Sequence, residues 1–262
     1  MIDRLLRRLL PVLSLVLFAG TAHAQGGPPF LTTDPGTPGN GNWELNLGAM
    51  VTRVPPVTAY QLPQLDLNLG IGERVQLTWE VPYVLQAEGG EVHGAWGNSV
   101  LGAKWRFLDK GAGNWQASVF PQLELAGSAT ARALGIAGEG PRLLLPLEVA
   151  RRLGPLDVNL EVGYYFARHG PEERFVGLAV GRAVSARLEL DAEIFADRAS
   201  GELPDETTLD AGLRYHFNPA CILMAMAGRS ISGEGTGHTE FMGYLGVQIL
   251  LSEWGRALPR EH

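Results

Sequence analysis

The stretch LDVNLEVGYYF, residues 156–166, decides the fold. Apolar side chains occupy positions 156, 158, 160, 162 and 164, and aspartate, asparagine and glutamate stand at 157, 159 and 161. Successive side chains of a β-strand point to opposite faces, so this period of two predicts a strand with one apolar and one polar face. The question that follows is whether the apolar face meets a protein core or lipid.

The same alternation recurs along the chain. It is found at 43–51, 65–71, 75–83, 101–107, 115–125, 188–194, 209–217 and 241–251. Three less regular segments, 142–151, 174–183 and 220–229, are interpreted as strands from their length and spacing. The total is about twelve strands, within a range of roughly 10 to 14, and most approach the ~9–11 residues of a membrane-spanning strand.

The connections between these strands alternate in length. Long ones at 54–60, 86–98, 127–140, 168–173, 200–206 and 232–238 are separated by short ones at 71–74, 109–113, 153–155, 184–186 and 218–220. This rhythm is typical of an up-and-down barrel whose two rims face the periplasm and the exterior. A soluble periplasmic β-sandwich or lipocalin-like barrel is the alternative, and it would be soluble without detergent.

A barrel of about twelve strands is too wide to be filled by side chains, so apolar residues turned inward would line a void. We therefore predict an all-β, transmembrane, antiparallel up-and-down β-barrel with its apolar face toward the lipid bilayer and a polar lumen. The predicted lumen-lining residues, a candidate substrate path, are Glu44, Asp66, Glu80, Lys104, Arg106, Glu124, Asp157, Glu161, Arg187, Glu189, Asp191, Glu193, Asp210 and Arg214. The predicted aromatic belts at the lipid–water boundaries are Trp43, Tyr83, Trp105, Phe107, Trp115, Tyr164, Tyr215, Phe217 and Phe241.

The chain begins with a pattern typical of a secretory signal peptide, residues 1–24. It combines basic residues, a stretch of apolar residues and a small-x-small cleavage sequence. A Gly/Pro-rich segment at 25–41, the barrel at 42–251 and a tail at 252–262 are expected to follow. Export through the signal peptide and the barrel predict the outer membrane of a Gram-negative-type cell.

Charge and cysteine content exclude some classes. Removing the predicted signal peptide takes away three of 21 basic and one of 28 acidic residues, which leaves a net charge of −9. Such a balance argues against nucleic acid as a partner. The single cysteine, Cys221, excludes an intrachain disulfide.

Three N-terminal stretches carry a family resemblance. PPFLTTDPGTPGNGNWELNLG (28–48), LGIGERVQLTWEVPYV (69–84) and VLGAKWRFL (100–108) together resemble the MetA-pathway-of-phenol-degradation family. The resemblance implies an exported, transporter-like outer-membrane barrel, with hydrophobic or aromatic compounds as candidate substrates. Outer-membrane assembly machinery is then an expected partner, although the chain ends on SEWGRALPREH (252–262) and not on an aromatic residue.

Motifs for catalysis are weak. The chain has no P-loop, no nucleophile-elbow GxSxG and no CxxC, and no nucleotide, flavin or metal cofactor is implied. Glu189, Asp191 and Glu193 share a strand face at a spacing that suits paired carboxylates, but a polar lumen wall is the simpler interpretation. Histidines 93, 169 and 238 fall in predicted exterior loops beside glutamates, and a polar loop surface is again the simpler interpretation.

The expected function is an outer-membrane channel or transporter for small-molecule solutes, and not an enzyme. The acidic lumen wall predicts weak cation selectivity. The alternatives are a non-conducting structural barrel and an outer-membrane lipid-modifying hydrolase. A hydrolase would need a serine close to a histidine, and His216 has no nearby serine pattern.

Overall fold

The computed structural model describes residues 27–138, 140–168, 171–200, 205–232 and 237–252. The predicted signal peptide and nearly all of the predicted C-terminal tail lie outside these residues. The elements are β1 (Trp43–Val54), β2 (Val57–Ile71), β3 (Val75–Glu88), β4 (Glu91–Trp96), β5 (Ser99–Asp109), β6 (Gln116–Val119), β7 (Gln122–Leu125), α2 (Ala129–Ala133), β8 (Arg142–Leu153), β9 (Leu156–Ala167), β10 (Glu173–Ala183), β11 (Leu188–Ala199), β12 (Glu206–Asn218), β13 (Cys221–Ser230) and β14 (Phe241–Leu251).

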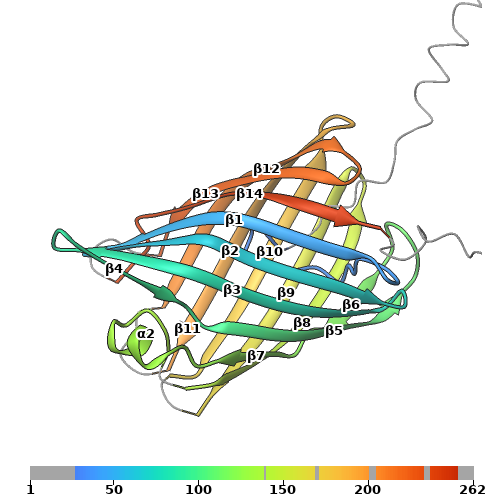
Figure 1. The fold of residues 1–262 in the computed structure, drawn as a ribbon. Coiled ribbons are helices and arrows are strands. Elements are labelled where there is room, and N and C mark those ends of the chain that lie inside the picture. Colours follow the sequence, from blue (N-terminus) through green and yellow to red (C-terminus); the bar gives the residue numbers. More distant parts are fainter. Residues whose placement is uncertain (1–26, 139, 169–170, 201–204, 233–236, 253–262) are drawn as a thin grey trace, which may run out of the picture.

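The strands form one closed antiparallel barrel (Figure 1). Apart from two broken strands, each strand pairs with its neighbours in sequence. β14 closes the wall by pairing with β1 from Trp43↔Leu251 to Arg53↔Phe241. Two positions in the wall are each formed by two strands in place of one. At the first, β4 and β5 both pair with β3. At the second, β6 and β7 both pair with β5 on one side and with β8 on the other. The wall therefore has twelve strand positions, which confirms the predicted fold class.

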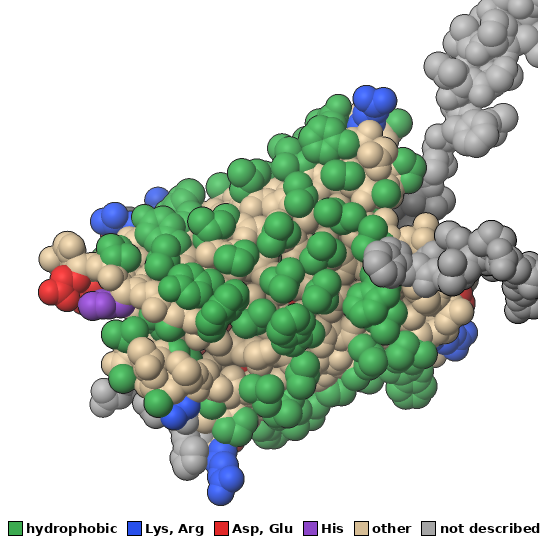
Figure 2. Space-filling model, viewed as in Figure 1, with side chains coloured by type: hydrophobic (Ala, Val, Ile, Leu, Met, Phe, Trp, Pro, Cys, Tyr) green, Lys and Arg blue, Asp and Glu red, His purple; other side chains and the backbone are tan. Residues whose placement is uncertain are grey.

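The period of two sorts the side chains as predicted, with charged and amide groups inside and aliphatic groups outside. On β9, Asn159 and Glu161 are buried while Leu160 and Val162 are more than a third exposed. Figure 2 shows hydrophobic side chains spread over the visible wall, with charged groups toward its ends. No helix in the described part of the chain is long and apolar enough to cross a membrane.

The two rims differ, although less than the sequence suggested. The connections at 72–74, 110–115, 154–155, 184–187 and 219–220 are short and share one rim. At the other rim, two predicted loops contain β-structure: β1 and β2 are joined only by Pro55 and Pro56, and 86–98 forms a hairpin of β3 and β4 that projects beyond the wall (Figure 1). The long connection 126–141 carries the short helix α2, capped by Ser128.

The Gly/Pro-rich segment does not simply precede the barrel. Residues 27–38, which we call the lumen segment, run inside it (Figure 1). Gly41 and Asn42 exchange backbone hydrogen bonds with Gly70 near the short-turn rim, where the chain enters the wall at β1. From there the segment reaches inward, and a turn closed by Gly27 N–H to the Thr32 carbonyl (2.7 Å) ends its described part.

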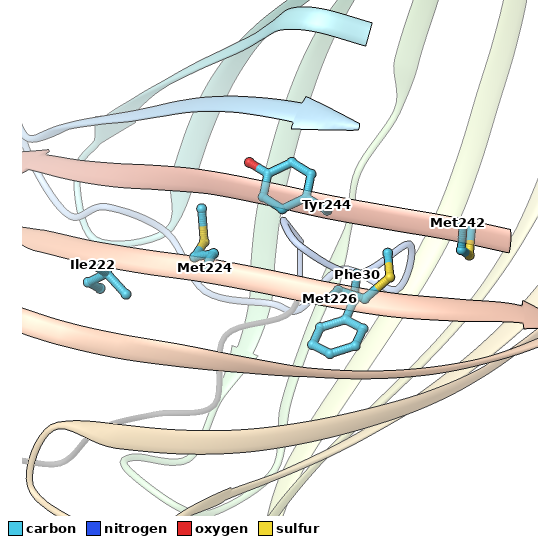
Figure 3. Close-up of a cluster of buried hydrophobic side chains, with 6 residues drawn as sticks. All are labelled: Phe30, Ile222, Met224, Met226, Met242 and Tyr244. Carbon is cyan, nitrogen blue, oxygen red and sulfur yellow. The ribbon is translucent and has the colours of Figure 1, made fainter. Parts of the chain in front are cut away.

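A small apolar cluster lies inside the barrel beside the lumen segment. Phe30 of the segment lies among inward-facing side chains of β13 and β14, including Met226 and Tyr244 (Figure 3). The apolar inner face of β13 explains why residues 220–229 showed no clear alternation. Here the polar lumen wall is replaced by a surface on which an aromatic ring packs.

Candidate functional site

The lumen segment is held through its backbone. The carboxylate of Glu193 accepts hydrogen bonds from the backbone N–H groups of Leu31 (3.2 Å) and Thr32 (2.6 Å). The carboxylate of Glu161 accepts one from Thr33 N–H at 2.6 Å. Both glutamates are almost fully buried, where hydrogen bonds to a charged acceptor are stronger than neutral ones. Two predicted lumen acids therefore anchor this segment.

A buried ion pair anchors the next part of the segment. Lys104 Nζ lies 3.4 Å from the Glu148 carboxylate and also donates a hydrogen bond to the carbonyl of Asp34. The same carboxylate accepts hydrogen bonds from the hydroxyls of Ser118 and Thr33. Because Glu148 has no exposed surface, these donors replace the water that it has lost.

An arginine and a glycine of the wall adjoin the lumen segment. Arg214 donates hydrogen bonds to the backbone carbonyls of Gly27 (3.2 Å) and Pro28 (3.1 Å). A Cβ atom at Gly177 would lie 2.1 Å from Thr32 Oγ1, so the absence of a side chain there lets the segment approach the wall.

The structure places thirteen of the predicted lumen-lining residues on the inner face of the wall. They are Glu44, Asp66, Glu80, Lys104, Arg106, Glu124, Asp157, Glu161, Glu189, Asp191, Glu193, Asp210 and Arg214. Arg187 is different: it lies in the turn before β11 and is exposed. The strand begins one residue later than the alternation suggested, because 184–187 is needed to reverse the chain.

Several inner-face residues were missed. Glu148 was overlooked because its inner-face neighbours in sequence, Pro146 and Ala150, are not polar, although Arg142 and Arg152 are in phase with it. The inner-face aromatic residues were missed because aromatic residues were expected on the lipid face. Facing glycines are a usable signal: Gly163 is opposite Phe175, and Gly177 is opposite Phe195.

The predicted belt residues lie on the outer face. Trp43, Trp105 and Phe107 are near the short-turn rim, and Phe241 is near the other; each is more than a third exposed. Others form ring pairs, such as Tyr215 with Phe217 at 5.2 Å between centroids. The complete set on this face is Trp43, Tyr83, Trp105, Phe107, Trp115, Tyr164, Tyr215, Phe217 and Phe241.

Three cavities remain around the lumen segment. The outer cavity, toward the long-loop rim, has a volume of about 400 Å³. The middle cavity of about 70 Å³ and the short-turn cavity of about 160 Å³ follow. The principal lining residues of the outer cavity are Tyr165, Glu173, Phe175, Phe195 and Asp197. Those of the middle cavity are Glu44, Asp66, Asn68, Gln76 and Gln248. Those of the short-turn cavity are Arg106, Asn114, Arg152, Asp157 and Asn159.

Adjacent cavities share lining residues. Glu80, Phe120 and Thr33 line both the outer and the middle cavity. Asp34 and Gly36 line both the middle and the short-turn cavity. The three cavities therefore follow one another along the lumen segment, and we call the two places where they share lining residues the necks.

The geometry of the histidines and carboxylates gives little support to a catalytic site or a metal site. Within the described ranges, no group of three or more His, Cys, Asp or Glu residues is arranged to hold a metal ion. His93 lies 3.3 Å from Glu91 on the exposed hairpin, and His238 lies in the connection before β14. Position 169 lies outside the described residues. No hydrogen bond joins His216 to a serine among the residues described, and Glu193 is occupied by the lumen segment.

A closed wall with an aliphatic exterior and a charged interior defines the class of the protein: a transmembrane β-barrel of the outer-membrane type. Solved structures of this class share the fold. An outer-membrane channel from Pseudomonas putida F1 is 13% identical, covering 86% of this chain and 99% of its own, with a TM-score of 0.65. The KdgM porin in complex with oligogalacturonate is 12% identical over 79% of this chain and 98% of its own, with a TM-score of 0.57.

The β-domain of the Bordetella autotransporter BrkA is also similar, with 13% identity over 80% of this chain and 98% of its own and a TM-score of 0.50. No protein-family model matches the chain, and no curated protein matches its sequence. At these identities the likeness is one of fold. This likeness confirms the outer-membrane type of β-barrel fold that the sequence resemblance implied.

Proposed function

We propose that this protein is an outer-membrane channel for small-molecule solutes, which pass between the lumen segment and the wall. The observation that carries the proposal is the succession of three cavities with shared lining residues. A barrel that served only as a structural element would gain nothing from a charged, partly open interior. By the usual arrangement of such barrels, the short turns face the periplasm.

The lumen segment is part of the proposed path. Its carbonyl and amide groups are paired with Glu161, Glu193, Lys104 and Arg214, so it narrows the lumen at a defined place. A solute must then pass the neck between the outer and middle cavities beside Glu80 and Phe120. Such a channel favours small solutes over large ones.

Single-channel recording in planar bilayers tests the proposal. Purified, refolded protein should give discrete conductance steps, and Glu80→Trp should lower the step size because the indole fills the neck. Glu73→Trp is the matched control, since Glu73 is exposed in the turn between β2 and β3. Folding is checked by heat-modifiable mobility on gels. Correctly folded wild-type protein without conductance would overturn the proposal and favour a structural barrel.

A further inference from the structure

The outer cavity contains a group of aromatic side chains that point into the lumen. Phe175 and Phe195 are stacked, with ring centroids 5.0 Å apart and an interplanar angle of 25°. Tyr165 lies next to them, its centroid 6.2 Å from that of Phe175. Aromatic residues on the inner wall of a water-filled barrel expose apolar surface where a polar side chain would be stable. Their position therefore points to contact with a solute.

The lumen already pairs cations with aromatic rings. The Arg142 guanidinium lies 4.5 Å from the centroid of Tyr165 and forms ion pairs with Glu124 (2.9 Å) and Glu173 (2.8 Å). A ring face attracts a cation electrostatically, and a nearby carboxylate adds to the attraction.

A second pair repeats this combination near the neck. Lys104 Nζ lies 4.7 Å from the centroid of Phe120, and its carboxylate partner is Glu148 at 3.4 Å. In both places a ring, a carboxylate and a cation of the chain itself are brought together. The combination is thus a recurrent feature of this lumen.

A third ring and carboxylate lack a cation from the chain. Asp197 of β11 is directly opposite Phe175 of β10 and, on its other side, opposite Glu206 of β12. It forms no ion pair with any cation in the described part of the chain. The neighbouring Arg174 also lines the outer cavity, but its position on the strand is opposite Arg198, and it forms no ion pair with Asp197 among the described residues.

Deeper in the path, acceptors also outnumber donors. Gln248 is only 4% exposed, lines the middle cavity, and has an Oε1 atom without a hydrogen-bond partner among the described residues. The carboxylates of Glu44 and Asp66 line the same cavity, and Glu80 stands at its neck. Lys104 also lines this cavity, but it is paired with Glu148. A solute that donates hydrogen bonds and carries positive charge therefore suits the middle cavity better than an anion does.

We propose that the outer cavity, residues Tyr165, Phe175, Phe195 and Asp197, is a binding site for small organic cations that carry an ammonium group on a flat apolar body. This inference rests on the proposed channel function and names its substrate class. The apolar body lies against Phe175 and Phe195, and the ammonium group is held by Asp197. The same cation then passes Phe120 and Glu80, which line both the outer and the middle cavity.

Isothermal titration calorimetry on the purified, refolded chain in detergent tests the proposal without requiring conduction. The probes are phenethylammonium, the neutral 2-phenylethanol and the anion phenylacetate, which share the phenyl body. Phenethylammonium should bind at least about ten-fold more tightly than either other probe, the ratio that one well-placed charge interaction of about 1.4 kcal/mol provides.

Variants locate the site. Asp197→Asn should weaken phenethylammonium binding roughly ten-fold while leaving 2-phenylethanol unchanged, and Phe195→Leu should weaken both. Glu91→Gln, on the exposed hairpin, is the charge-matched control and should change neither. Equal affinity for phenylacetate, or an unchanged affinity in a folded Asp197→Asn protein, would overturn the inference. Binding without conductance would overturn the channel instead, so the two failures are distinguishable.

Discussion

At the scale of single residues, Glu148 is the most constrained acid in the lumen. Its side chain has no exposed surface, yet it contacts Lys104, Ser118 and Thr33, which come from three separate parts of the chain. Removing a carboxylate from water is costly unless charge and hydrogen bonds replace the water. Glu148 therefore joins the wall and the lumen segment, and its charge matters chiefly because Lys104 is buried beside it.

Glu148→Gln should lower the free energy of unfolding by about 3–5 kcal/mol, because it leaves the buried Lys104 ammonium without its partner. Urea unfolding in lipid vesicles measures the change. The double variant Lys104→Met/Glu148→Gln keeps the amide for the hydroxyl donors and removes the unpaired charge, so its loss should be smaller. Equal losses in the two variants would show that the ion pair is not the source of the effect.

At the scale of elements, the lumen segment is unusual because its stability comes from the wall. It forms no helix or strand, and its backbone groups are satisfied by side chains that are more than 60 residues away in sequence. Its fit depends on small wall residues, of which Gly177 makes the closest approach to the segment at Thr32.

Gly177→Ala should lower the free energy of unfolding by roughly 1–3 kcal/mol, the usual cost of overpacking. The added methyl group would meet Thr32 Oγ1, which stands 2.1 Å from the ideal Cβ position. Combining it with Thr32→Ala should recover part of this loss, giving a coupling energy of about 0.5–3 kcal/mol in a double-mutant cycle. Strictly additive effects, measured by urea unfolding, would mean that the segment does not contact the wall at this point.

The strands and the lumen segment also differ in how well the sequence predicts them. The period of two predicted which side chains face the lumen on nearly every strand, even across the break at Phe120 and Pro121. It could do so because the two faces of the sheet meet different surroundings, which fixes the register of each strand. The sequence predicts a loop at 86–98, because its glycines interrupt the alternation, whereas the structure forms the β3–β4 hairpin there. The lumen segment has no period at all, and contacts such as Thr33 with Glu148 join residues too far apart for any local pattern to reveal.

At the scale of the whole molecule, the inner and outer faces of the barrel carry side chains of opposite polarity. The interior keeps acids and bases that bind the lumen segment and line the cavities, while the exterior offers an aliphatic band between two aromatic rims. Such an exterior is stable only in lipid, because water would meet a large continuous apolar surface. The depth of a side chain in the bilayer should then decide the cost of charging it.

Two lipid-facing leucines make this testable. Leu160 is at the middle of β9, and Leu153 is the last residue of β8 at the short-turn rim; both are more than a third exposed on the outer face. Leu160→Arg should lower the free energy of unfolding in lipid vesicles by about 2–4 kcal/mol, and Leu153→Arg by only about 0–1 kcal/mol, since the arginine at the rim reaches the interface. Both variants replace the same side chain with the same charged one, so they differ in the depth of the substituted position in the bilayer. If Leu160→Arg cost no more than Leu153→Arg, the middle of β9 would not lie in hydrocarbon, and the barrel would not span the bilayer as described.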